Sequence, residues 1–139
     1  MVIGSGALFY SLKTSRFLFL LRHGAKHQGT WGLVGGKKEL SETNLDGLNR
    51  EIIEELNFLP NIIKYIPIET FTSQDQHFEY NTYICVVENE FLPILNHENF
   101  GYCWVDLNFY PRPLHPGLYE TLKLPIIQEK IKLLKEIIS

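Results

Sequence analysis

The segment "GGKKELSETNLDGLNREIIEELNF", Gly35 to Phe58, decides how this chain is organised. After its paired glycines, the apolar residues recur at helical steps: Leu45, Leu48, Ile52 and Leu56. Thr43, with Asp46 three residues later, resembles a capping box that begins a helix. Asn57 tolerates the left-handed conformation that ends many helices. The segment therefore predicts a helix over residues 45–56.

Arg50 in this helix is followed within little more than a turn by three carboxylates: Glu51, Glu54 and Glu55. Their side chains converge on one patch, and their repulsion costs about 1 kcal/mol, which a stable domain tolerates. One interpretation is a solvated acidic face. The other is half of a metal site, because the glycine turn at 35–36 offers a backbone carbonyl and Glu42 adds an acid at a fixed offset. We favour the metal site, since Mg²⁺ and Mn²⁺ prefer such oxygen ligands.

The rest of the chain alternates strand patterns with a single early helix and a helical end. Strand patterns cover residues 2–11, 16–22, 30–36, 62–71, 78–88 and 101–107, with loops at 24–30 and 88–99. From His115 onward the pattern is helical, with an interruption at Pro125. This order predicts an α/β fold, a mixed sheet covered by helices on both faces. We expect a single domain over residues 1–139.

Charge and composition exclude several classes of function. A net charge of -3 and a pI near 5.9 argue against a broad nucleic-acid footprint, so we expect no DNA partner, although a single nucleotide fits. Cys85 and Cys103 lack zinc-site spacing, and we interpret both as buried thiols in a reducing compartment. The apolar run at 17–21 is too short to span a bilayer, and the N-terminus does not resemble a secretory signal. We expect a cytoplasmic protein with no membrane partner.

The segment at 35–58 resembles the signature of the Nudix hydrolase family, G-x5-E-x7-R-E-U-x-E-E-x-G-U, where U is a bulky apolar residue. The matching positions are Gly36, Glu42, Arg50, Glu51, Ile52, Glu54, Glu55 and Phe58. The one departure is Asn57 in place of glycine, which still suits the end of a helix. "WGLVGG" and "CWVDL" are also similar to family segments. The resemblance implies a Nudix-type α/β/α sandwich.

The resemblance also implies an activity, the hydrolysis of a nucleoside diphosphate linked to another group X, assisted by divalent ions. It implies Mg²⁺ or Mn²⁺ ligands at Glu51, Glu54 and Glu55 and at the backbone carbonyl of Gly35, and we rank Glu54 first. The pair formed by the family's arginine and first glutamate is structural, which assigns Glu42 and Arg50 to support of the ligands.

Outside this segment, family members carry another acid in the loop before a late tryptophan strand, where it binds metal or acts as a base. Glu98 lies six residues before Trp104 and is similar in placement. We therefore expect Glu54, Glu51 and Glu98 to be the catalytic acids. A solvated loop acid remains the alternative for Glu98. His97 is a weaker candidate base, and two other acids compete weakly: Glu88 and Glu90.

Substrate contacts are less legible in the sequence. Positive side chains after the second strand, namely Arg22, Lys26 and His27, suit phosphates, and the rings of Phe71, Phe78 or Tyr80 suit a base. Core packing or a solvated loop is the alternative for each. Our expected substrate contacts are Arg22, Phe71 and Tyr80. Trp31 and Trp104 are interpreted as scaffold aromatics.

The leading hypothesis is a pyrophosphohydrolase that acts on ADP-ribose, a nucleotide sugar or a nucleoside triphosphate. Two alternatives stay open: a catalytically silent domain that senses a nucleotide, and an enzyme that removes pyrophosphate from RNA 5′ ends. The sequence does not specify the substrate or the oligomeric state, a homodimer included.

Overall fold

The computed structural model describes residues 1–24 and 26–138 and contains one seven-stranded sheet with helices on both sides. The strands are β1 (Val2–Ser11), β2 (Phe17–Arg22), β3 (Trp31–Gly32), β4 (Val34–Lys37), β5 (Lys64–Thr72), β6 (Phe78–Val87) and β7 (Asn99–Val105). The helices are α1 (Asn44–Leu56), the short 3₁₀ helix η1 (Leu107–Phe109), α2 (Pro116–Lys123) and α3 (Pro125–Ile138).

Strand β1 is the centre of the sheet. It runs parallel to β6 along one edge, and its other edge is shared by β4 near its start and β2 near its end, both antiparallel. Strand β5 extends the sheet beyond β6, while β3 and β7 both pair with β2. The sheet is therefore mixed, as the sequence predicted.

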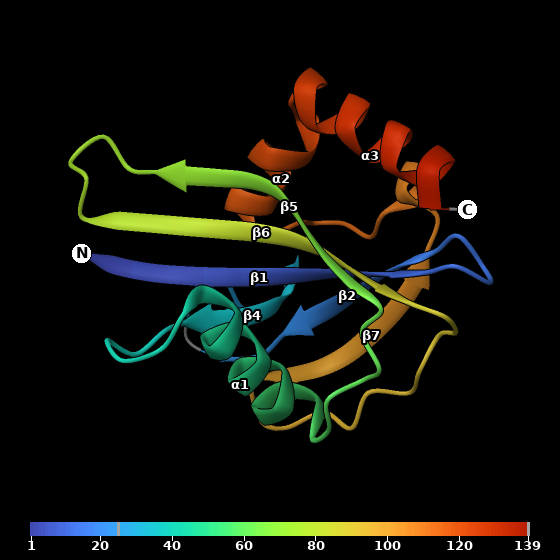
Figure 1. Ribbon diagram of the computed structural model, residues 1–139. Helices are drawn as coiled ribbons and strands as arrows, with labels where there is room; N and C mark the ends of the chain where they lie inside the picture. The colour runs from blue at the N-terminus through green and yellow to red at the C-terminus, as the bar shows by residue number, and fades with distance from the viewer. Residues whose placement is uncertain (25, 139) are drawn as a thin grey trace.

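The two faces of the sheet carry separate apolar cores. Along β1, Ala7 and Phe9 face the cluster that contains α1, while Leu8 and Tyr10 face the cluster that contains α2 and α3. This alternation follows from the two-residue period of a strand. Figure 1 shows the result, with α1 on one side of the sheet and α2 and α3 on the other. The predicted α/β/α sandwich is confirmed.

The predicted ends of helix α1 are also confirmed. Thr43 Oγ1 accepts a hydrogen bond from the Asp46 N–H at 3.1 Å, and Asn57, with φ of 64°, closes the helix by donating its N–H to Ile53 O at 2.8 Å. Of the four apolar residues at helical steps, Leu48, Ile52 and Leu56 are buried, whereas Leu45 in the first turn is 37% exposed.

Other boundaries differ in places where pairing partners decide them. The strand predicted over 30–36 is split at Leu33, because β3 pairs with β2 whereas β4 pairs with β1. The strand predicted over 101–107 ends at Val105, since Leu107 begins the 3₁₀ helix. The predicted loop at 24–30 is a set of turns and bends in the described residues, and its Ala25 lies outside them.

The apolar run at the start of β2 is a buried strand, as expected, with Phe17 and Leu20 almost fully covered. No helix in the described part of the chain is both long and apolar enough to cross a membrane.

The prediction that both thiols are buried is wrong for one of them. Cys85 is fully buried in β6, whereas Cys103 is only partly buried, because β7 pairs with a single neighbouring strand at the edge of the sheet. Both cysteines are free.

Candidate functional site

A cleft of about 840 Å³ is lined by residues of the sheet, of helix α1 and of helix α2. This size suits a small ligand. Most of the side chains proposed from the sequence line it, although they come from six separate parts of the chain: Arg22, Gly35, Glu51, Glu55, Phe71, Tyr80 and Glu98. Glu54 is not among the residues that line the cleft.

Glu55 is the most buried acid of the site, with 4% of its surface exposed. Its carboxylate accepts hydrogen bonds from the Gly35 N–H at 2.7 Å and from Asn99 Nδ2 at 3.2 Å. Burial raises the pKa of Glu55 to about 8, since these two bonds offset only part of the desolvation and the charges of Glu98 and Glu51 raise it further. Glu55 therefore joins α1 to β4 at the floor of the cleft.

Arg50 organises the remaining acids of α1. Its guanidinium holds Glu42 through two hydrogen bonds of 2.8 and 3.0 Å and also donates to Lys37 O at 3.0 Å. A third nitrogen, Nη1, donates to Glu51 at 3.0 Å and to Glu54 at 3.2 Å. The hydrogen bonds from Arg50 lower the pKa of Glu42 to about 2. This geometry fixes the loop before α1 against the helix.

Glu51 and Glu54 share Arg50 but occupy different environments. Glu51 is 15% exposed and lines the cleft, whereas Glu54 is 50% exposed and faces outward. Burial raises the pKa of Glu51, and hydrogen bonding from Arg50 offsets part of that shift. Gly36 makes room for Glu51, because a Cβ at Gly36 would lie 2.5 Å from Glu51 Cδ.

The neighbouring Gly35 lies where β4 passes closest to β1. A Cβ at this position would lie 2.0 Å from Ser5 O and 2.8 Å from Gly6 Cα, both backbone atoms of the paired strand. No side-chain rotation relieves such a contact, so the β1–β4 pairing has to shift if any other residue replaces Gly35.

We expect Gly35→Ala to lower the free energy of unfolding by about 2 kcal/mol or more, because overpacking against backbone forces the strands apart. Urea denaturation followed by circular dichroism measures the change. Gly32→Ala is the matched control, since its Cβ would meet nothing nearer than Arg22 Cδ at 3.6 Å. Equal stability of the two variants would contradict the close approach.

Facing these acids, the cleft has a positively charged wall. Arg22 comes from the end of β2, and its Nε is buried without a hydrogen-bond partner among the described residues. Lys26 and His27 are exposed in the following loop. His115 Nδ1 accepts from the Gly117 N–H at 3.0 Å, and burial, followed by the nearby positive charges, lowers the pKa of His115 to about 4. His115 is therefore neutral at pH 7, with its proton on Nε2.

Glu98 ends the loop before β7 and lines the cleft with an exposed side chain. Its backbone is held on both sides, because its N–H donates to Asn96 Oδ1 at 2.8 Å and its carbonyl accepts from the His23 N–H at 2.8 Å. Asn96 also donates to Glu54 O at 2.7 Å, which ties this loop to α1. His97 is exposed and does not line the cleft. Glu88 and Glu90 do not line the cleft either.

Aromatic side chains of β5 and β6 form the floor of the cleft at the end away from Glu55. Phe71 is 51% exposed and Phe78 36% exposed, with their ring centroids 6.4 Å apart. Tyr80 stacks against Phe78 at 6.2 Å and lies across Gly6, where a Cβ would be 2.2 Å from the Tyr80 hydroxyl. Burial raises the pKa of Tyr80, so the phenol keeps its proton at neutral pH.

Residues far from the signature segment complete the site, and local sequence patterns carry little sign of them. Asn99 is paired with Arg22 at a bulge between β2 and β7, and His115 caps α2. The only local signals were their neighbours, an acid before Asn99 and the helix start at His115. Their role depends on strand register, which a single sequence does not display.

The acids of the cleft are candidate ligands for a divalent cation. No three imidazole, thiol or carboxylate groups in the described ranges, 1–24 and 26–138, are gathered closely enough to hold an ion by themselves. Mg²⁺ needs only one or two protein carboxylates, with water and substrate phosphates completing its octahedron. Glu98 lies close enough to Glu51 and Glu55 for its charge to contribute to the raised pKa of both. The carboxylate and carbonyl oxygens present fit such a partly open site.

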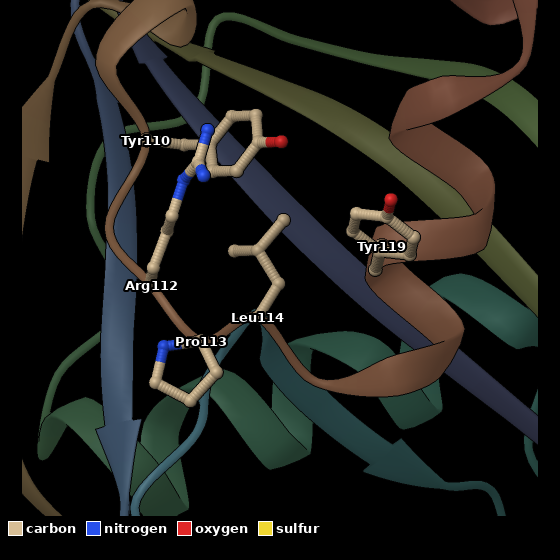
Figure 2. Close-up of a pocket in the computed structure, with 5 residues that line it drawn as sticks. All are labelled: Tyr110, Arg112, Pro113, Leu114 and Tyr119. Carbon is tan, nitrogen blue, oxygen red and sulfur yellow. The ribbon is translucent and has the colours of Figure 1, made fainter.

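A second, smaller pocket of about 320 Å³ lies beside α2, away from these acids. Figure 2 shows Leu114 and Pro113 at its base and Tyr119 reaching in from α2. The Arg112 guanidinium lies over the Tyr110 ring, 5.7 Å from its centroid. None of the acids described above lines this pocket, so it is separate from the cleft.

The family model and the solved structures that match this chain indicate the same family. A family model described as the NUDIX domain matches residues 3–124. No curated protein matches the chain in sequence. The structure is similar to that of a MutT NUDIX hydrolase from Burkholderia pseudomallei, with a TM-score of 0.73 and 23% identity over 91% of this chain and 95% of that chain.

Two further solved structures support the same architecture. A NUDIX hydrolase from Nitrosomonas europaea has a TM-score of 0.72 and 20% identity over 93% of this chain and 71% of its own. An Ap4A hydrolase from C. elegans has a TM-score of 0.62 and 19% identity over 76% of this chain and 80% of its own. At such identities these likenesses establish the fold alone.

Proposed function

This chain belongs to the NUDIX family, and from that premise we propose that it is a pyrophosphohydrolase that cleaves a nucleoside diphosphate linked to a second group, using Mg²⁺ or Mn²⁺. One observation carries the proposal. A single cleft joins the carboxylates of Glu51, Glu55 and Glu98 to the positive side chain of Arg22. Carboxylates suit a divalent ion and the arginine suits a phosphate, so a pyrophosphate bridged by an ion has partners on both walls.

The metal ligands in this proposal are four carboxylates and one backbone carbonyl: Glu51, Glu54, Glu55, Glu98 and the carbonyl of Gly35. A divalent ion there would neutralise charge on the phosphate oxygens and make a water molecule more acidic. Arg50 keeps the acids of α1 in fixed rotamers, with Glu42 completing its hydrogen bonds. Glu98, exposed and without an ion pair among the described residues, accepts the proton of the attacking water.

The opposite wall stabilises the phosphate. The buried Nε of Arg22 has no hydrogen-bond partner among the described residues, and a phosphate oxygen would satisfy it. Neutral His115 offers an Nε2–H, and Lys26 adds positive charge at the rim. Donors fixed in advance stabilise the negative charge that develops in the transition state.

The other end of the substrate contacts the aromatic floor. Phe71 stacks on a planar base, with Phe78 beside it. Tyr80 lies deeper and contacts the substrate through its ring edge and its neutral hydroxyl. This arrangement favours a small nucleotide as the substrate.

The free thiols of Cys85 and Cys103 suit a reducing cytoplasm, where the whole chain, residues 1–139, works as one domain.

The test is a substrate panel with Mg²⁺ or Mn²⁺ that includes nucleoside triphosphates, ADP-ribose, a nucleotide sugar and a dinucleoside polyphosphate. We expect turnover of at least one substrate, with AMP, another nucleoside monophosphate, phosphate or pyrophosphate as products, and complete loss of turnover with EDTA. Mass spectrometry and phosphate release measure the products. Tight nucleotide binding with no cleavage in the presence of either ion would contradict the proposal and favour a nucleotide sensor.

A further inference from the structure

Glu69 is an acid of the cleft that belongs to neither the signature segment nor the metal site. The pairing of β5 with β6 shifts between Pro67 and Glu69, so Glu69 lies opposite Thr82. Two residues further on, Phe71 lies opposite Tyr80. A bulge reorients the side chains that follow it. Glu69 and Phe71 are therefore on the same face of the sheet, and both line the cleft.

The Glu69 carboxylate is braced from the other side of the cleft. Thr121 of α2 donates its hydroxyl to Glu69 Oε1 at 2.7 Å. No cation pairs with Glu69 among the described residues. In contrast, Glu120, which precedes Thr121 in α2, pairs with Lys123 at 3.0 Å. Glu69 is half-buried. A partly desolvated carboxylate with a fixed orientation and no cation is an acceptor for donors brought by a ligand.

Base chemistry determines which ligand fits. An ionised carboxylate only accepts hydrogen bonds, so it pairs best with an edge that presents two adjacent donors. Guanine presents N1–H beside its 2-amino group. Adenine presents its 6-amino group beside the N1 acceptor, whose lone pair faces the carboxylate unfavourably. A base stacked on Phe71, with Phe78 beside it, has its edge within reach of Glu69, because residues two apart on a strand are neighbours on one face.

We propose that Glu69 reads the edge of the base and makes the enzyme select guanine nucleotides over adenine nucleotides. This inference rests on the proposed function, which supplies the cleavage reaction. The selection of the base can be measured separately, through nucleotide binding. Thr121 is a positioning residue that holds the Glu69 carboxylate toward Phe71 and Phe78.

The experiment compares GTP, ITP and ATP in hydrolysis and compares their non-hydrolysable α,β-methylene analogues in calorimetric binding. The wild type should prefer GTP over ATP by about 10- to 100-fold, as expected of a bidentate contact. ITP, which keeps N1–H but lacks the 2-amino group, should fall between them. In Glu69→Gln, the amide offers one donor and one acceptor, so GTP should weaken about 10-fold or more while ATP holds or improves.

Glu79→Gln is the matched control, because Glu79 lies on the opposite face of β6 and hydrogen-bonds Asn81 outside the cleft. It should leave the GTP-to-ATP ratio unchanged, and circular dichroism checks that both variants fold. Equal wild-type affinity for the GTP and ATP analogues would overturn the inference, as would binding of neither or tighter binding of ADP-ribose than of both. A third outcome separates the two proposals. If the binding preference between the GTP and ATP analogues switches in Glu69→Gln but no nucleotide is hydrolysed, the selection of the base by Glu69 is supported and only the proposed cleavage is contradicted.

Discussion

Glu54→Gln should lower kcat by about 100-fold or more while the protein stays folded. The amide keeps the size of the side chain and its oxygen still accepts from Arg50, which is 3.2 Å from Glu54 in this structure. What it removes is the negative charge. If Glu54 turns from Arg50 to hold a divalent ion beside Glu51, the lost charge raises the barrier by the amount typical of a removed electrostatic contact in an active site.

The outward position of Glu54 makes this a decisive test. As a mere surface partner of Arg50, its carboxylate would be worth little, since exposed ion pairs contribute about 0–1 kcal/mol to stability and nothing to chemistry. Activity should be measured at saturating Mg²⁺ beside Glu129→Gln, an exposed glutamate of α3 on the other side of the sheet. Normal kcat in a folded Glu54→Gln protein would remove Glu54 from the metal ligands.

The metal-free protein should lose stability as the pH rises, through Glu55. Its pKa in the folded state is about 8, well above the usual 4.5 of an unfolded glutamate. Such a group contributes stability that is fully present below pH 4.5 and is lost progressively as the pH rises toward 8. The loss can reach about 5 kcal/mol as an upper limit, since each pKa unit is worth about 1.4 kcal/mol.

Denaturation in EDTA between pH 5.5 and 9 measures this effect, with Glu55→Gln as the comparison. The variant cannot ionise, so its stability should change less with pH, and above pH 8 it should be more stable than the wild type. Saturating Mg²⁺ should stabilise the wild type most at high pH, because metal binding competes with the proton. Parallel curves for the two proteins would show that burial of Glu55 carries no such cost.

The parts of the structure that could be predicted are those that local sequence determines. The caps of α1 depend on Thr43 and Asn57, which act within one turn of the helix, and both are confirmed. The spacing of Glu42 from Arg50 brought those two side chains together because a short loop and one helix carry both. The α/β/α order followed from strand and helix periodicity.

What escaped prediction depends on contacts between distant segments. Glu55 follows Glu54 in sequence, yet only Glu55 is buried, because β4 covers one side of the acidic patch and leaves the other to solvent. Glu69 reaches the cleft, and Asn99 reaches the carboxylate of Glu55, through register shifts in two different strand pairs. Periodicity carries no information about such shifts, so these residues had no signal before the sheet was known.

The central position of β1 has a consequence for how the chain is made. Its parallel partner, β6, begins at Phe78 and is synthesised long after Val2 has left the ribosome. At a synthesis rate of about 5–20 residues per second, several seconds pass before β6 can pair with β1. During this time the apolar side chains on both faces of β1 lack that partner. Non-local pairing of this kind folds slowly. We therefore expect the central strand to be the part of the nascent chain most prone to aggregation until β6 has been made.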